Sequence, residues 1–141
     1  MGLFDIFKKK SAPIKESKKV VPLETMKFNK MWDLWETGQA KSPYQELMTY
    51  QAEVNNGGHS QFFYNVENSG GDLDAVVREV LSILPKTLHR NLEKALSTYK
   101  KYNEVDEDKM DDILDTCDDV FYENEDDINN ILENYAETIE L

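Results

Sequence analysis

Residues 50–72 read YQAEVNNGGHSQFFYNVENSGGD and decide the fold. Two Asn/Gly-rich breaks, at 55–58 and 68–71, bracket a short aromatic segment at 59–67. Glycine tolerates positive φ, so each break can end a helix in a left-handed cap and redirect the chain within a few residues. The pattern predicts a short central helix around which longer flanking helices pack.

The central segment combines apolar mass with side-chain amides. Phe62 and Phe63 are large aromatics, whereas Gln61 and Asn65 are four residues apart and therefore share one helical face. We interpret the two amides as buried groups that satisfy the backbone of the turn. His59, next to Gly58, is interpreted as part of a helix-start turn.

Capping residues and apolar periodicity predict helices on both sides of this segment. Ser42 is expected to cap a helix with Pro43 at its first position and Gln45 in a capping box. Asp72 is expected to cap the next helix, and Asn124 to cap the second of two helices in the acidic end. The remaining expected helices cover about residues 23–36 and 86–101, and no stretch alternates as a strand would.

The fold class that these patterns predict is all-α, a single compact domain of six or seven helices around the short central helix. The expected domain covers residues 23–141, with a motif core at 44–102 and acidic helices at 104–141. Residues 1–22 contain six lysines and two prolines and are predicted to be a flexible basic tail. Contact of this tail with an anionic membrane is the less favoured alternative.

Composition restricts the class of protein. The chain has 141 residues and a formal net charge of -12, which disfavours direct binding to nucleic acid and favours basic partners. The single cysteine, Cys117, excludes an internal disulfide, and no apolar run is long enough to cross a membrane. We therefore expect a cytoplasmic protein. Cys117 falls on an apolar stripe, so we interpret it as a buried hydrophobe.

Most of the negative charge lies beyond residue 102, where sixteen acidic residues face one lysine. Carboxylates four residues apart on a helix are separated by ~6 Å along its axis, which is comparable to the spacing of phosphates along a DNA strand. We predict that these carboxylates form a row that binds a partner. The candidate binding residues are Asp108, Asp111, Asp112, Asp115, Asp118, Asp119, Asp126 and Asp127.

The segment at 50–65, with the Ser-Gly that follows at 69–70, resembles the signature of the bacterial DNA-mimic protein family. That signature is an acidic residue, then N-G-G, two variable residues, Q, two aromatics and N, and the resemblance covers about residues 23–102. It implies an all-helical protein whose surface carboxylates imitate DNA phosphates and occupy a DNA-binding protein. The motif residues here are Asn56, Gly57, Gly58, Gln61, Phe62, Phe63 and Asn65.

The favoured function is thus a non-enzymatic acidic protein that binds a DNA-binding protein such as a transcription regulator, with no cofactor, no metal and no catalytic residue. Homodimerisation is left open. One alternative is an immunity- or antitoxin-like protein that neutralises a basic toxin. A less favoured one is a hydrolase or metal enzyme with a cleft near His59. A solvated acidic face without a partner is the plainest reading of residues 104–141.

Overall fold

The computed structural model describes residues 21–141, so the expectations for residues 1–20 of the tail lie outside it. The described part contains five α-helices and no strand, which confirms the all-α prediction; the expected number, six or seven, is wrong. The helices are α2 (Leu23–Glu36), α3 (Tyr44–Asn68), α4 (Leu73–Leu81), α5 (Lys86–Tyr102) and α6 (Glu107–Glu137).

The expected central helix is the second half of α3. The first Asn/Gly break is a kink inside α3, where Gly57 and Gly58 leave helical dihedral angles and two helical stretches meet. Gly58 has a φ of +79°, a left-handed value that glycine adopts without steric cost. The glycine pair therefore redirects the chain between the two helical stretches of α3.

The start of α3 also differs from the prediction. The helix begins at Tyr44, Pro43 precedes it, and no side chain caps its first amides. The Ser42 hydroxyl donates to the Glu46 carboxylate, while the side-chain oxygen of Gln45, Oε1, accepts from the backbone N–H of Ala40. The expected Ser42 cap is absent because both polar groups bond elsewhere. The Asp72 cap of α4 is confirmed, since its carboxylate accepts from the Ala75 amide at 3.1 Å.

The acidic end forms one helix where two were predicted. Asn124 lies inside α6 and donates to the Val120 carbonyl, one turn earlier, so it is not a cap. The apolar stripe remains in phase across this point, because Phe121 and Ile128 are seven residues apart, close to two full turns, and both are buried. Because the buried face is continuous, α6 continues through Asn124 as one helix.

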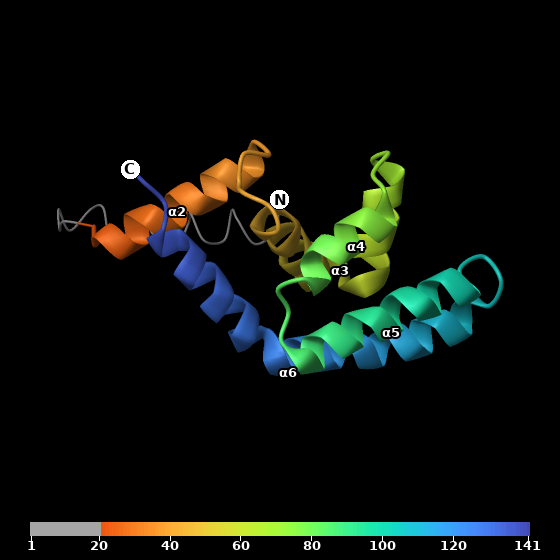
Figure 1. Cartoon of the computed structure of the whole chain (residues 1–141). Coiled ribbons are helices and arrows are strands. Elements are labelled where there is room, and N and C mark those ends of the chain that lie inside the picture. Colours follow the sequence, from red (N-terminus) through yellow and green to blue (C-terminus); the bar gives the residue numbers. More distant parts are fainter. Residues whose placement is uncertain (1–20) are drawn as a thin grey trace.

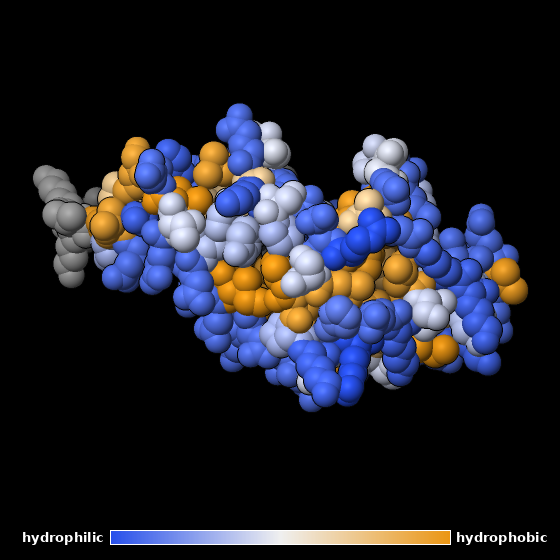
Figure 2. Space-filling model, viewed as in Figure 1, coloured by the Kyte–Doolittle hydropathy of each residue, from blue (hydrophilic) through white to orange (hydrophobic). Residues whose placement is uncertain are grey.

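Helix α6 is the longest element and connects the rest (Figure 1). Its first half runs beside α5; it then bends, and its second half rises toward α2. Helix α3 packs above the middle of α6, and α4 packs against α3 and α5. One hydrophobic cluster extends from Met31 in α2 through Phe62 and Phe63 in α3 to Ile128 in α6. In Figure 2, apolar residues gather in the middle of the visible face, and hydrophilic residues cover the outer edge of α5 and α6.

Aromatic side chains of α2 and α3 contribute to this cluster. Trp32 and Tyr50 are buried, and Trp35 and Tyr44 are partly buried against the same cluster. The Tyr44 ring stacks on Tyr135 of α6, with centroids 4.0 Å apart. These contacts attach α2 and the start of α3 to the second half of α6.

Candidate functional site

Helix α6 carries thirteen acidic residues and one lysine. Eight of the acids fall on one side of the helix and are all exposed, so they form one stripe, here called the outer row. Successive members are three or four positions apart, except for a step of seven between Asp126 and Glu133. At ~1.5 Å per residue, the row follows ~44 Å of helix. Its members are Asp108, Asp112, Asp115, Asp119, Glu123, Asp126, Glu133 and Glu137.

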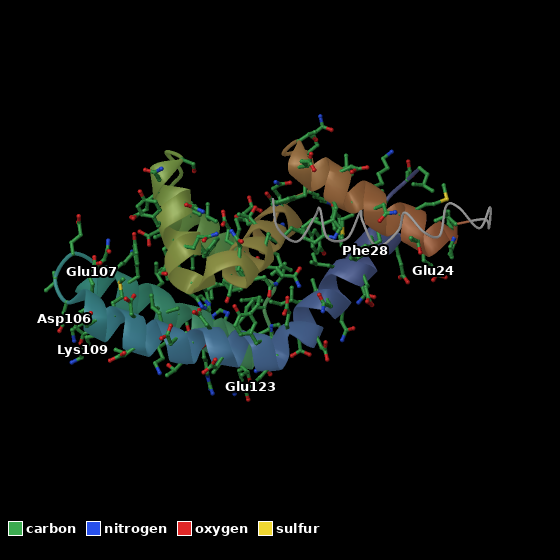
Figure 3. All side chains as sticks on the ribbon, turned by 180° about the vertical axis from the view of Figure 1, so that it is seen from behind. Glu24, Phe28, Asp106, Glu107, Lys109 and Glu123 are labelled. Carbon is green, nitrogen blue, oxygen red and sulfur yellow. The ribbon has the colours of Figure 1, made fainter. Side chains whose placement is uncertain are left out.

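The outer row has few compensating charges. In the described part of the chain, no lysine or arginine forms an ion pair with any carboxylate of α6. Lysines do lie near two of its members. Lys94 and Lys101 line a groove between α5 and α6 together with Asp112, and Lys27 of α2 donates to the backbone carbonyl of Glu137 at 3.1 Å. Figure 3 shows Glu123 at the outer side of the bend in α6. The row is therefore an exposed polyanionic surface.

The eight acids predicted to bind a partner do not all lie on this surface. Five of them, Asp108, Asp112, Asp115, Asp119 and Asp126, belong to the outer row. Asp127 is exposed beside the row. Asp111 lies at a cleft beside α3. Asp118 is only 19% exposed and faces inward, because it bonds to α3.

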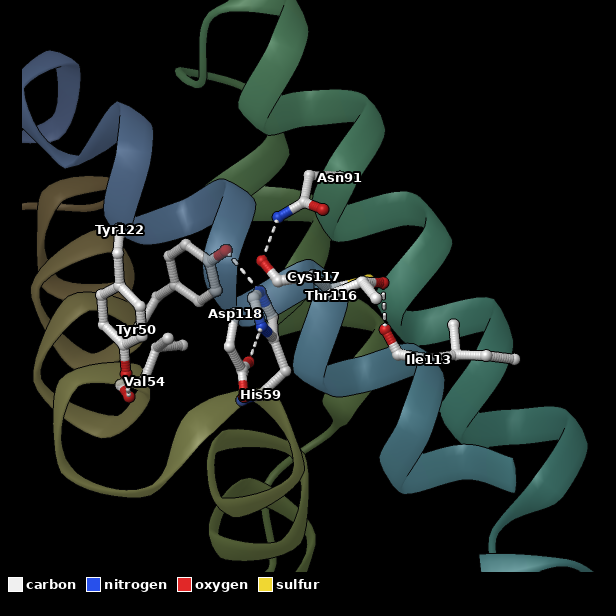
Figure 4. A network of polar contacts seen from close by, with 9 residues as sticks. All are labelled: Tyr50, Val54, His59, Asn91, Ile113, Thr116, Cys117, Asp118 and Tyr122. Carbon is white, nitrogen blue, oxygen red and sulfur yellow. Dashed lines mark hydrogen bonds and ion pairs between the residues drawn. The ribbon is translucent and has the colours of Figure 1, made fainter. Parts of the chain in front are cut away.

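Asp118 holds α6 against the kink of α3 (Figure 4). One of its carboxylate oxygens accepts from the backbone N–H of His59 at 2.9 Å and from the His59 Nδ1 at 2.6 Å. An ionised carboxylate can only accept, so Nδ1 carries a proton, and in the neutral imidazole Nε2 accepts from the Tyr50 hydroxyl at 2.7 Å. The Tyr122 hydroxyl donates to the Val54 carbonyl nearby. His59 follows the kink directly, at the start of the second helical stretch of α3, as the helix-start interpretation expects, but its ring bonds to Asp118 and Tyr50 and does not cap a backbone amide.

Burial shifts the pKa of two groups in this region, Tyr50 and Cys117. It raises the pKa of the Tyr50 hydroxyl well above its ordinary value, and the neighbouring Cys117 and Asp118 raise it further. Burial also raises the pKa of the Cys117 thiol. Cys117 is buried, as predicted. The Tyr50 hydroxyl and the Cys117 thiol thus stay protonated at neutral pH, which suits a structural network.

Asp118 belongs to a second set of acids, here called the inner row: Asp111, Asp118 and Glu125. Seven residues make about two helical turns, so the three lie on one side of α6, toward α3. Glu125 accepts from Gln51 at 3.0 Å and from Asn55 at 2.6 Å. Two inner-row carboxylates therefore join α6 to α3 on either side of the kink.

The motif amides have a partner that the sequence interpretation did not identify. Glu53 accepts from Gln61 Nε2 at 2.8 Å and from Asn65 Nδ2 at 3.0 Å, so the amides bind a side chain and not the turn backbone. A Cβ at Gly57 would clash with Gln61, and a Cβ at Gly58 would clash with Asp118. The two glycines are needed because these polar side chains approach the backbone closely.

An open cleft of about 840 Å³ lies next to these amides. Its walls are the second half of α3, the end of α5 and the start of α6. Three carboxylates line it, those of Glu104, Glu107 and Asp111, and no lysine or arginine does. Figure 3 shows Glu107 at the loop that joins α5 and α6. The side chain of Tyr64, also at the cleft, is 60% exposed.

The cleft does not contain the histidine that the enzyme alternative requires. His59 is 0% exposed and is not among the lining residues. The described residues include no group of three or more His, Cys, Asp or Glu side chains arranged to hold a metal ion. None of the described helices has the length and apolar character required to cross a bilayer.

The sequence does contain a signal for the inner row. Asp118 and Glu125 each lie four residues after one buried residue of α6 and three before the next, at the border of the apolar stripe. Acids at such a border are candidates for contacts with a neighbouring helix. Glu53 is the acidic residue of the family signature, but the signature does not indicate its partners, because the amides lie beyond a kink whose angle the sequence does not specify.

Comparison with known proteins places the chain in a family. A family model described as DMP19-like protein matches residues 45–139. The expected span of the resemblance, 23–102, is corrected: the match leaves out α2 and includes nearly all of acidic α6. No curated protein and no solved structure matches the chain significantly. Because the matched segment covers well over half of the sequence, the chain belongs to the DMP19-like family.

Proposed function

We propose that this protein is a non-enzymatic interaction protein whose outer row occupies the DNA-binding surface of a basic partner, such as a transcription regulator. The observation that carries the proposal is the unpaired stripe of eight carboxylates on α6. Membership of the DMP19-like family, whose matched segment includes this helix, supports it.

The charge density of α6 supports mimicry of a single DNA strand over mimicry of a duplex. Helix α6 carries a net charge of about -12 over ~46 Å, or one charge per ~4 Å. Duplex DNA carries one charge per ~1.7 Å, and each of its strands one per ~3.4 Å. One copy of α6 therefore resembles a single phosphate strand. The outer row alone carries one charge per ~5.5 Å. A protein that releases counterions when it meets phosphates gains electrostatic energy of the same kind from this row.

The test is affinity capture from the native host with mass spectrometry, at low and high salt. The quadruple variant Asp108→Asn, Asp115→Asn, Asp119→Asn, Asp126→Asn should weaken binding to the captured partner at least ~10-fold and reduce its salt dependence. Its matched control removes four exposed charges outside α6: Asp33→Asn, Glu36→Gln, Glu79→Gln and Glu140→Gln. If the two variants weaken binding equally, the outer row is not part of the interface.

Competition separates the two classes of basic partner. Duplex DNA should displace the protein from a transcription regulator, because both ligands use the same surface. If the captured protein is instead a basic toxin whose activity the chain blocks, the immunity or antitoxin function replaces DNA mimicry. A partner that binds equally well at all salt concentrations contradicts both.

A further inference from the structure

The inner row points to a site that the proposed function does not use. Asp118 bonds to His59 and Glu125 bonds to Gln51 and Asn55, so two members of the row have partners on α3. The third, Asp111, lies two turns before Asp118 on the same side of α6. Its carboxylate has no hydrogen bond or ion pair with any described residue, and it faces the cleft.

The opposite wall of the cleft offers acceptors whose orientation is set. Gln61 and Asn65 each direct the amide nitrogen at Glu53, and a carboxylate only accepts, so neither amide can be flipped. Their carbonyl oxygens accept no hydrogen bond from described residues, and neither oxygen is buried. Both residues line the cleft. This wall thus presents two solvent-accessible acceptors held in place by a third side chain.

Charge and shape narrow the class of ligand. The carboxylates of Glu104, Glu107 and Asp111 line the same cleft as the two amides, and the cleft is lined by no basic residue. The site therefore selects a cation with several N–H donors. The exposed ring of Tyr64 adds a flat surface on which a planar cation can stack. A guanidinium meets all three conditions, because it is planar, always charged and carries five donors.

We propose that this cleft binds the guanidinium group of an arginine side chain supplied by the partner protein. The inference deepens the proposed function and rests on it for the existence of the partner. DNA-binding surfaces are rich in arginine, so such a partner carries the required group. The outer row would supply long-range attraction, and the cleft a specific anchoring point beside it.

The direct test is NMR titration of the full-length protein with N-acetyl-arginine amide, with N-acetyl-lysine amide and free arginine as comparison probes. The expected result is saturable shifts of the Gln61 and Asn65 side-chain amides, with affinity several-fold higher for the blocked arginine than for the lysine probe. Shifts that do not saturate, or that spread along the outer row, overturn the proposal. Tighter binding of free arginine overturns the assignment to a protein side chain.

Two variants test the cleft itself. Glu107→Gln with Asp111→Asn should weaken arginine binding ~10-fold, whereas Asp115→Asn with Asp126→Asn, which removes the same charge elsewhere on α6, should change it less than ~2-fold. Tyr64→Ala alters a largely exposed side chain and should reduce the preference for arginine over lysine. Equal losses in the two charge variants would show that only net charge matters, and an unchanged preference in Tyr64→Ala would exclude stacking.

The two proposals fail in different ways. If the arginine probe does not bind but the outer-row variant still loses its partner, only the cleft inference is wrong. If the arginine probe binds and the outer-row variant keeps full affinity for the captured partner, the proposed function is wrong. In that case the cleft remains a guanidinium site, but its assignment to that partner is also withdrawn.

Discussion

Gly58 illustrates how one residue positions the acidic helix. Its φ of +79° and ψ of -179° lie in a region that is almost exclusive to glycine and costs an L-residue ~1–3 kcal/mol, and a Cβ there would clash with the carboxylate of Asp118. We expect Gly58→Ala to lower the free energy of unfolding by ~2–4 kcal/mol, because the Asp118 bond to His59 must move. Urea unfolding measures the loss.

Gly38 provides the control for this prediction. Its φ is +74°, but a Cβ would meet nothing within 4 Å, so Gly38→Ala should lose only the backbone contribution of ~1 kcal/mol. If the two substitutions have equal effects, the contact of Gly58 with Asp118 contributes nothing to stability.

Tyr50 should make the fold sensitive to alkali. Burial holds the pKa of its hydroxyl well above the ordinary value of 10.0, so the unfolded chain releases this proton at a lower pH than the folded chain. Stability is then complete below pH ~10 and falls as the pH rises further. Tyr50→Phe should lower stability at neutral pH by ~1–3 kcal/mol, because His59 loses its bond, but should make the alkaline decline shallower.

The measurement is chemical unfolding of wild type and variant at a series of pH values on either side of the tyrosine range. The decline will not vanish, because burial also raises the pKa of Tyr122, and burial with a hydrogen bond to Glu67 raises that of Tyr99. Parallel curves for the two proteins would show that Tyr50 does not contribute to the alkaline transition.

At the scale of the element, the continuity of α6 can be tested against the break predicted from Asn124. Replacing a residue inside a helix by alanine raises the stability of the protein, whereas replacing an N-cap residue by alanine lowers it by ~1 kcal/mol. Asn124→Ala should therefore leave the free energy of unfolding unchanged or raise it by ~0.5 kcal/mol. Asp72→Ala, at a cap with an observed bond, should lower it by ~1 kcal/mol. A loss of equal size at Asn124 would indicate two helices.

These two positions also show what the sequence could predict. Asp72 is recognisable because its signal is local: a capping residue directly before an apolar stripe. Asn124 is also a capping residue before apolar positions. The buried stripe stays in phase from Phe121 to Ile128, however, so the helix continues through Asn124, and this continuity cannot be recognised from the capping residue alone. Gly57 is similar, since a glycine pair allows either a helix end or a kink. The choice depends on packing with residues far along the chain.

The same contrast between local signals and distant contacts applies to the candidate site. The outer row follows from helical periodicity, so five of its members were identified from the sequence. The inward turn of Asp118 was not, because it depends on His59, 59 positions earlier in the chain, reaching the same point in space. Contacts between residues so far apart in the sequence depend on the kink angle of α3, which no local sequence pattern specifies.

At the scale of the whole molecule, the charge of -12 sets a response to salt that distinguishes folding from binding. Neighbouring outer-row carboxylates are ~6 Å apart, inside the Debye length of ~10 Å at 0.1 M salt but outside the ~3 Å at 1 M. Added salt should therefore screen their repulsion and raise the melting temperature of the isolated protein.

This increase should be smaller in the quadruple outer-row variant, which has less repulsion to screen, than in the control variant with four charges removed elsewhere. Partner binding should respond in the opposite direction and weaken as salt rises, because the same carboxylates then attract less strongly. Thermal unfolding and affinity measured over one salt series test both signs together. A melting temperature that does not depend on salt would mean that the outer row is neutralised within the chain and cannot act as a substitute for phosphate.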